Sequence, residues 1–256
     1  MTGGAGGDGV DGPGLSHRSG LGAGRVLRVV PEQLEASRWR RRLDFRLARV
    51  RRRLILIGTP RSAGEPRSDL ERRFRARCRE LQAPSVLELG TKQSVPGRST
   101  MHRDWVPHAS EFRGSDIEDG ADVDIVADAH RLSEVVGRER FDVILSCSTF
   151  EHLKYPTLAA HEIMKTLTVG GLLFVQTHQS FPLHGYPSDY FRFSREALAS
   201  LFGTTMGFEV IETNFDFPAN VYSRRLPDSH RHPAFLNTTL WGTKRAPTPN
   251  DYHHEL

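Results

Sequence analysis

Three acidic residues in the middle of the chain each lie at or just after the end of a short apolar run. Glu88 ends the first run, Asp116 lies near the end of the run at 112–117, and Asp128 follows the run at 123–127. Such runs are typical of central parallel strands, whose carboxyl ends meet at the edge of the sheet where ligands bind. A carboxylate after the second strand can accept from both ribose hydroxyls, and one after the third can accept from an adenine amino group. A single acid of this kind is commonly a helix N-cap or a loop residue, but three at successive strand ends predict a site for a nucleotide-like ligand.

The elements that must position these acids alternate between strands and helices. Helices are predicted over 157–167, with Gly170-Gly171 as the stop signal, and from Ser194 to about Phe202. The segment 91–111 contains two prolines and a glycine, so we expect a loop with one or two short helical turns. We predict an α/β fold: a doubly wound, mostly parallel, seven-stranded sheet with an antiparallel pair at one edge. The predicted strands cover 85–91, 112–117, 123–127, 141–146, 172–177, 208–215 and 237–244.

Four segments of the chain differ in composition. Residues 1–24 are glycine-rich and predict a disordered tail, 25–82 a helical extension, 83–246 the main α/β domain, and 247–256 a C-terminal tail. Within the extension, 39–54 repeats apolar residues at steps of three and four among many arginines. This pattern predicts an amphipathic helix that packs on the main domain. A helix lying on a membrane surface and a basic arm for nucleic acid are the alternatives.

Composition narrows the class of protein. The chain has 256 residues, 38% of them hydrophobic and 26% charged, and no apolar run approaches the roughly 18 residues of a membrane span. Cys78 and Cys147 lie in unrelated segments, which predicts reduced thiols and a cytoplasmic location. A net charge of +4 permits an acidic partner without requiring one. The four histidines after residue 229 are loosely spaced and have no cysteine near them, so we expect no metal site.

Six short motifs follow one another between residues 85 and 245: Glu88-Leu89-Gly90, Asp116-Ile117, Asp128-Ala129, Phe141-Asp142-Val143-Ile144, Glu151-His152-Leu153 and Gly170-Gly171-Leu172. Their order and spacing resemble class I S-adenosylmethionine-dependent methyltransferases, and are most similar to the broad methyltransferase type 11 group. The resemblance implies the Rossmann-like methyltransferase fold and S-adenosylmethionine as the cofactor. The first motif would border the methionine part, the second would hold the ribose, and the third would meet the adenine.

The resemblance implies a set of cofactor-binding residues: Glu88, Leu89, Gly90, Thr91, Asp116, Ile117, Asp128, Ala129 and Ser146. The chain departs from the family at one point. Lys92 and Ser94 stand where further glycines usually follow the first strand, and Lys92 could instead meet the carboxylate of the cofactor. The absence of a GxGxxG motif argues against a dinucleotide dehydrogenase.

The acceptor side carries three histidines and a polar loop. A hydroxyl acceptor must be aligned and must lose its proton, and imidazole is the side chain best matched to that task near neutral pH. We predict His184 as the base, with His152 and His178 as alternatives, although each could also be a structural histidine. Three other residues of the loop are predicted to bind the acceptor: Asp189, Tyr190 and Arg192. The acid and the arginine could equally form a plain salt bridge that pins the loop.

Three functional hypotheses follow. We predict a methyltransferase that acts on an oxygen of a sugar-like or other hydroxyl-bearing small molecule. The first alternative is an RNA or protein methyltransferase that uses the arginine-rich helix. The fourth strand ends in 146–149 (SCST) and not in an NPPY-type sequence for methylation of base amino groups, which favours the small-molecule acceptor. The second alternative is a scaffold that binds the cofactor without catalysis.

Overall fold

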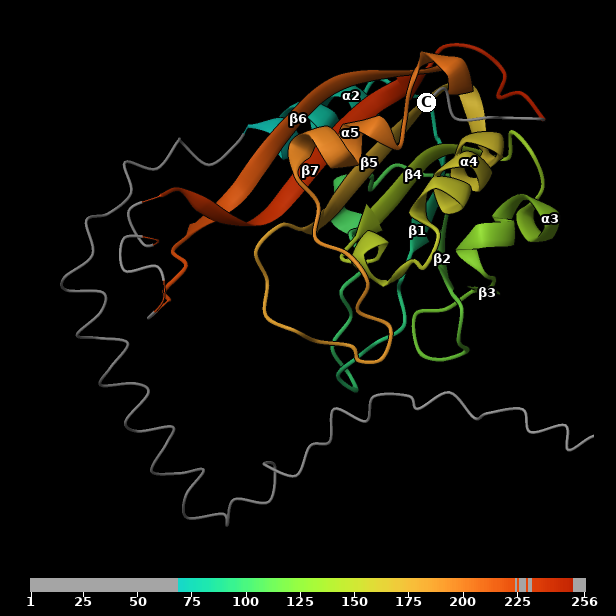
Figure 1. The fold of residues 1–256 in the computed structure, drawn as a ribbon. Helices are drawn as coiled ribbons and strands as arrows, with labels where there is room; N and C mark the ends of the chain where they lie inside the picture. Colours follow the sequence, from blue (N-terminus) through green and yellow to red (C-terminus); the bar gives the residue numbers. More distant parts are fainter. Residues whose placement is uncertain (1–68, 224, 226–228, 230–231, 251–256) are drawn as a thin grey trace, which may run out of the picture. The chain divides into compact units, whose positions relative to one another are not determined.

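The computed structural model describes residues 69–223, 225, 229 and 232–250, which Figure 1 shows in colour. They belong to one compact unit, Pro60–Leu256. The predictions of a tail at 1–24 and of an amphipathic helix at 39–54 lie outside the described residues, as does the end of the chain from residue 251.

Seven strands form one sheet in the order β3-β2-β1-β4-β5-β7-β6 (Figure 1). They are β1 (Ser85–Leu89), β2 (Glu111–Asp116), β3 (Ile125–Val126), β4 (Phe141–Cys147), β5 (Leu167–His178), β6 (Phe208–Ala219) and β7 (Ala234–Lys244). All neighbours from β3 to β5 pair in parallel, whereas β7 is antiparallel to both β5 and β6. The predicted mostly parallel sheet with an antiparallel edge pair is therefore confirmed.

One face of the sheet is covered by α2 (Leu70–Cys78). The helix buries Leu70, Phe74 and Cys78 completely. The ring of Phe74 packs against Phe174 of β5 at a centroid distance of 5.1 Å. Full burial of one such side chain stabilises the fold by roughly 1.5–3 kcal/mol. The helix α2, which lies within the predicted extension 25–82, is thus part of the core.

The opposite face is covered by three helices, α3 (Leu132–Val136), α4 (Pro156–Thr166) and α5 (Arg195–Ser200) (Figure 1). Their buried residues join the side chains that the central strands direct to this face. In β1, Leu87 and Leu89 lie in this cluster, whereas Val86 lies in the cluster beneath α2. Both faces of β1 are apolar because both are covered, which explains why its sequence reads as a continuous apolar run.

The boundary between α4 and β5 differs from the prediction. The helix ends at Thr166, and the predicted stop signal Gly170-Gly171 lies inside β5. The pairing of β5 with β4 shifts there, because Leu167 pairs with Phe141 and the next pair is Leu172 with Val143. Gly170 has φ +87°, which allows this irregularity. The glycine pair therefore bends a strand and does not end a helix.

The connections at the carboxyl ends of the central strands form the site. The long connection from β1 to β2 contains only one short helical turn, η1 (Arg103–Trp105), as predicted. From β1 the chain continues to β2 on one side, while β4 lies on the other. Such a reversal opens a crevice at the carboxyl ends of the strands, the usual ligand position in α/β sheets.

Candidate active site

A cleft of about 620 Å³ opens at this reversal, beside the ends of β1 to β4. It brings together six of the residues predicted to bind the cofactor: Leu89, Gly90, Asp116, Ile117, Asp128 and Ala129. The strand register explains this, because Leu89 pairs with Ser115 in β2 and with Ser146 in β4. The three strands thus end at the same level.

Backbone amides hold the carboxylate of Asp116. Its Oδ2 accepts from the backbone N–H of Lys92 at 3.1 Å, and its Oδ1 accepts from that of Glu118 at 3.2 Å. Each carboxylate oxygen has two lone pairs, so both oxygens keep one for a ligand. Asp116 is therefore fixed in orientation and still able to accept from two neighbouring hydroxyls.

Asp128 is both a cap and a cleft residue. It is the N-cap of η2 (Ala129–Arg131), and its Oδ1 accepts from the backbone N–H of His130 at 2.9 Å. Nδ1 of the same histidine lies 2.6 Å from this oxygen. Burial acts to raise the pKa of Asp128, but these contacts from His130 outweigh it and hold the pKa below its ordinary value. The carboxylate is thus ionised where a ligand can reach it.

Gly90 allows the loops after β1 and β4 to approach closely. It has φ +74°, and a Cβ at this position would lie 2.2 Å from Oγ1 of Thr149. That hydroxyl donates to the carbonyl of Leu89 at 3.1 Å. A side chain at position 90 would therefore displace Thr149 from the wall of the cleft.

Three predicted cofactor residues lie elsewhere. Glu88 lines a neighbouring cavity, and Thr91 is buried with its hydroxyl donating to the carbonyl of Asp122 at 2.7 Å. Ser146 is fully buried and lines neither cavity, and its hydroxyl has no hydrogen-bond partner among the described residues. Ser148, two residues later, lines the cleft in its place. Beyond β4 the strand alternation ends, so position in a strand did not identify this residue.

A second cavity of about 940 Å³ adjoins the cleft. The two share one rim, formed by Gly90, Lys92, Ser94, Ser148, His152 and Gly185. The walls of the second cavity carry polar side chains from distant parts of the chain: Glu88, His102, Cys147, Gln176, His178 and Asn237. A molecule in this cavity would face a ligand in the cleft across the shared rim.

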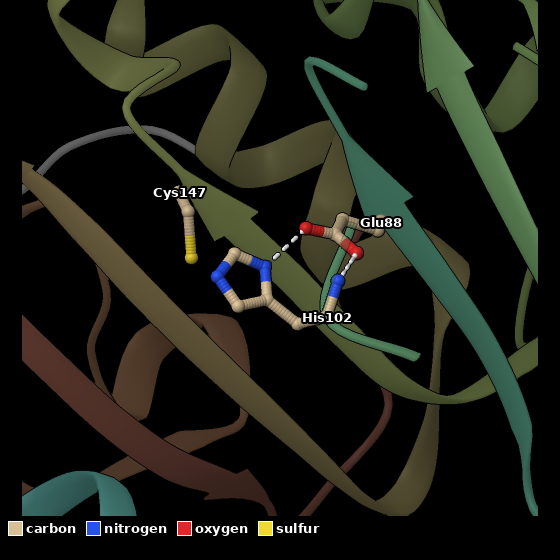
Figure 2. A group of neighbouring side chains, drawn as sticks. All are labelled: Glu88, His102 and Cys147. Atoms are coloured by element: carbon tan, nitrogen blue, oxygen red, sulfur yellow. Dashed lines mark hydrogen bonds and ion pairs between the residues drawn. The ribbon is translucent and has the colours of Figure 1, made fainter. Parts of the chain in front are cut away.

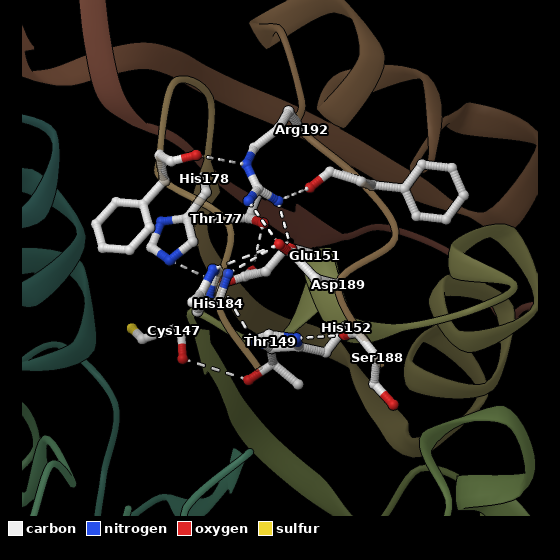
Figure 3. Close-up of polar contacts among 12 residues, drawn as sticks. Cys147, Thr149, Glu151, His152, Thr177, His178, His184, Ser188, Asp189 and Arg192 are labelled. Carbon is white, nitrogen blue, oxygen red and sulfur yellow. Dashed lines mark hydrogen bonds and ion pairs between the residues drawn. The ribbon is translucent and has the colours of Figure 1, made fainter. Parts of the chain in front are cut away.

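The three predicted histidines converge in this cavity around the buried carboxylate of Glu151 (Figure 3). Their Nε2 atoms lie 3.0 Å (His178), 3.8 Å (His184) and 3.9 Å (His152) from Oε1 of Glu151. Burial acts to raise the pKa of Glu151, but the contacts with His178 and Thr177 hold it below its ordinary value. Burial acts to lower the pKa of His178, yet Glu151 and Asn237 raise it above its ordinary value.

The loop residues predicted to bind the acceptor instead hold the loop in place. Arg192 donates to both carboxylate oxygens of Asp189, at 2.6 and 2.9 Å, and to the carbonyls of Phe181 and Pro182. The same carboxylate accepts from the backbone N–H of His184 at 3.0 Å. This pair holds the pKa of Asp189 well below its ordinary value, because Arg192 hydrogen-bonds to the carboxylate. Together with Tyr190, these residues line neither of the two cavities, so the salt-bridge alternative describes them better.

A histidine that the sequence did not single out completes the second cavity. Nδ1 of His102 lies 2.6 Å from Oε1 of Glu88, and Oε2 of the same carboxylate accepts from the backbone N–H of His102 at 2.9 Å. Figure 2 shows the other ring nitrogen on the side of Cys147. Burial raises the pKa of the Cys147 thiol well above its ordinary value, which makes it a poor metal ligand. The pair is therefore a histidine oriented by a buried carboxylate. Nothing in the spacing of the sequence could have revealed it, because His102 lies in the irregular connection after β1.

Part of the chain is similar to known proteins. Residues 103–175 match a family model described as a methyltransferase domain. Over these residues the chain is similar to methyltransferase domains. No curated protein sequence matches the chain.

Three solved structures are similar to this chain. One is a SAM-dependent methyltransferase from Archaeoglobus fulgidus, with 13% identity and a TM-score of 0.47 over 68% of this chain and 93% of that chain. Another is an S-adenosylmethionine-dependent methyltransferase from Mesorhizobium loti, with 14% identity and a TM-score of 0.45 over 67% and 96%. The third is the 1,6-didemethyltoxoflavin-N1-methyltransferase of Burkholderia thailandensis with S-adenosylhomocysteine, at 15% identity and a TM-score of 0.44 over 69% and 78%.

The residues of the cleft fit S-adenosylmethionine, the cofactor that the resemblance to methyltransferases implies. Asp116 offers two acceptor oxygens for a ribose diol, and Asp128 offers an ionised carboxylate beyond it. Gly90 leaves the backbone open to close approach. Lys92, at the position of a usual family glycine, pairs with Glu118 and lines both cavities. Among the residues that the structure describes, no helix combines the length and apolar character needed to cross a membrane.

Proposed function

We propose that this chain is a methyltransferase that acts on an oxygen of a small, hydroxyl-bearing molecule that binds in the second cavity. The observation that carries the proposal is the His102–Glu88 pair, a carboxylate-oriented imidazole in a cavity that shares its rim with the cofactor cleft. A volume of about 940 Å³ lies within the range of small-molecule sites, about 300–1,000 Å³. Its polar walls suit an acceptor with several hydroxyl groups.

The pair supplies the proton acceptor that a hydroxyl needs. The carboxylate of Glu88 can only accept when ionised, so the close contact at Nδ1 places the ring proton there. Nε2 of the neutral ring then keeps its lone pair. A base whose tautomer is fixed by a buried carboxylate is the arrangement that activates hydroxyl nucleophiles in many enzymes.

This geometry favours His102 over the histidine predicted from sequence. Nε2 of His184 lies near Glu151, whereas Nε2 of His102 has no such carboxylate beside it among the described contacts. His152 lies at the rim shared by both cavities, but its Nε2 is also near Glu151. We therefore assign proton removal to His102.

Each group of the chain has a role in this reaction. When bound, the cofactor supplies an electrophilic methyl group on a sulfonium. Asp116 and Asp128 position the cofactor in the cleft, and the walls of the second cavity align the acceptor oxygen. His102 takes the hydroxyl proton at Nε2 as the oxygen attacks, and Glu88 stabilises the imidazolium that forms.

The test is turnover of S-adenosylmethionine by the full chain with a panel of hydroxyl, amine, RNA and protein acceptors. We expect release of S-adenosylhomocysteine with a hydroxyl-bearing small molecule. His102→Gln should lower kcat by about a hundredfold or more, while the cofactor Kd stays near that of the wild type. His108→Gln is the matched control, because that ring contacts the carbonyl of Cys78 and lines neither cavity.

Two outcomes would contradict the proposal. One is turnover with RNA or protein acceptors and with no hydroxyl-bearing small molecule. The other is full activity of His102→Gln, which would remove this residue from the reaction.

A further inference from the structure

The cluster around Glu151 presents its donor atoms in an unusual way (Figure 3). The side chain of Glu151 is fully buried, next to three histidines that line the second cavity. Its Oε2 accepts from Oγ1 of Thr177 at 2.7 Å, but its Oε1 has no aligned hydrogen bond among the described residues. Three Nε2 atoms surround that oxygen at 3.0 to 3.9 Å.

The opposite nitrogen of each ring is already committed to an oxygen. Nδ1 of His152 lies 2.6 Å from the carbonyl of Ser188, and Nδ1 of His184 lies 3.2 Å from the carbonyl of Pro182. Nδ1 of His178 lies 2.9 Å from Oδ1 of Asn237. Carbonyl oxygens only accept hydrogen bonds, so each ring carries its proton on Nδ1. In their neutral forms, all three rings therefore have a lone pair on Nε2, and these three atoms lie 3.0 to 3.9 Å from Oε1 of Glu151.

Lone pairs that converge on a carboxylate oxygen repel one another unless a positive charge lies among them. A proton on Nε2 of His178 would balance the charge of Glu151, but it would leave the lone pairs of His152 and His184 unmatched. A metal cation satisfies Glu151 and these two rings together. Metal-bound histidines almost always donate their other ring N–H to a carbonyl, carboxylate or water, which is the pattern of all three rings here.

We propose that Glu151, His152 and His184 bind a divalent transition-metal ion such as Zn²⁺, while His178 remains a contact of Glu151 beside the ion. The potential ligand atoms of Glu151, His152 and His184 lie within 4.8 Å of one another, and Nε2 of His178 lies 3.0 Å from Oε1. Bonds of about 2.0–2.2 Å in a tetrahedral site separate the ligand atoms by roughly 3.4 Å, close to these distances. Imidazole and carboxylate form a donor set suited to zinc and similar ions.

The site runs against the expectation of no metal drawn from histidine spacing. The ligands come from two places, η3 (Phe150–His152) and the loop after β5. Gly185 makes the convergence feasible, because a Cβ there would lie 2.7 Å from Cε1 of His152. The Asp189–Arg192 pair then fixes the backbone of His184.

This inference rests on the proposed function and adds to it. The three histidines line the same cavity as His102. A metal ion at this position would bind oxygens of the acceptor and hold them within the cavity. The acceptor class narrows accordingly to molecules with two neighbouring oxygen ligands, such as a vicinal diol.

The experiment measures metal binding directly on the full chain. The purified protein is stripped with a chelator, titrated with Zn²⁺ in a calorimeter and analysed for metal by mass spectrometry. We expect one tightly bound equivalent, and visible absorption bands when Co²⁺ replaces Zn²⁺. His184→Gln should weaken Zn²⁺ binding by at least about a hundredfold, since loss of a supporting outer contact alone costs about 10–100-fold.

Glu151→Gln should weaken Zn²⁺ binding by a similar factor. Because Glu151 is fully buried, this variant could fail to fold, so His184→Gln, at a more exposed position, provides the independent test. His108→Gln should keep the full equivalent. Equal Zn²⁺ affinity in the wild type, His184→Gln and Glu151→Gln would overturn the inference, because the ion would then be adventitious. The absence of any bound equivalent would overturn it too.

The two proposals fail separately. One equivalent of Zn²⁺ that depends on His184, with no turnover of any hydroxyl acceptor, would support the metal site and refute the proposed function. Full turnover of a hydroxyl acceptor by protein that binds no Zn²⁺ would refute the metal site and leave the function standing.

Discussion

The cleft at the ends of β1 to β4 and the second cavity share a rim but are built in opposite ways. In the cleft, the carboxylates of Asp116 and Asp128 are held largely by backbone amides close to them in sequence or register. In the cavity, Glu88 holds His102, and Glu151 meets rings from three separate segments. One region is defined by where strands end, and the other by which side chains the folded chain brings together.

The difference indicates which region tolerates change. A site built from backbone geometry retains its shape when most of its side chains vary. A site built from contacts between side chains loses its geometry when any one partner is replaced. Substitutions in the cleft should therefore act on cofactor affinity alone, whereas substitutions in the cavity should act on the acceptor alone.

The largest effect on binding is expected at Asp116. Asp116→Ala removes two acceptor oxygens and should weaken the binding of S-adenosylmethionine by roughly ten- to a hundredfold, since a charge-assisted hydrogen bond contributes about 1.5–3 kcal/mol. Calorimetry measures this directly. Asp119→Ala is the control, because this neighbouring acid is exposed and does not line the cleft. Equal affinities for both variants would remove Asp116 from the cofactor site.

A change at the shared rim should break the separation between the two regions. Gly185 has φ +59°, and a Cβ there would collide with the ring of His152. Gly185→Ala should therefore raise both the Kd for the cofactor and the KM for the acceptor, each by about tenfold. An effect of this size is expected for roughly 1–3 kcal/mol of local strain.

Gly97→Ala is the matched control, because Gly97 has φ +76° but no atom within 4 Å of its added Cβ. Both variants carry the cost of a positive φ, and only Gly185→Ala meets a neighbour. An effect of the same size in both would show that backbone strain, and not contact with His152, is responsible.

A smaller effect, confined to the acceptor, is expected at Asp189. Asp189→Asn weakens the contact with Arg192 and the hold on the backbone of His184. The KM for the acceptor should rise by about three- to tenfold, corresponding to roughly 1 kcal/mol, while the cofactor Kd stays unchanged. Steady-state kinetics with calorimetry separate the two quantities. A change in cofactor Kd alone would contradict the division between the regions.

The smallest effect on either site is expected from Glu162 of α4, which lines neither cavity. Burial acts to raise its pKa, but Lys165 and the backbone and hydroxyl of Ser133 hold it below its ordinary value. A carboxylate with a lowered folded-state pKa stabilises the fold above its ordinary pKa, about 4.3, and this stability is lost as the pH falls through the folded value.

Glu162→Gln should therefore lower stability by about 1–2 kcal/mol at pH 7 and leave both binding constants unchanged. The gap between the denaturation curves of wild type and variant should close below about pH 4. A gap of constant size from pH 7 to pH 3 would show that charge on Glu162 is not the cause.

The fold was largely predictable because its signals are local. Short apolar runs ended by acids identified the central strands, and two strands with no clear helix between them identified the antiparallel edge pair. The exception is Gly170-Gly171, which resembles a helix stop but lies within β5. A glycine pair looks the same in sequence at a helix end and at an irregularity inside a strand. Only the pairing of Phe141 with Leu167 shows that the strand has already begun before the glycines.

The sequence by itself determined the parallel sheet and the acids at its edge, because strand order and strand ends follow from periodicity along the chain. It also identified His152, His178 and His184 as chemically capable residues. Only the tertiary structure showed that these rings lie around Glu151. It also showed that Glu88 contacts the ring of His102, and that the Asp189–Arg192 pair holds a loop in place. These contacts join residues as far apart as Glu151 and His184, or His178 and Asn237. Contacts of this kind depend on side-chain directions in three dimensions, which no spacing along the sequence specifies.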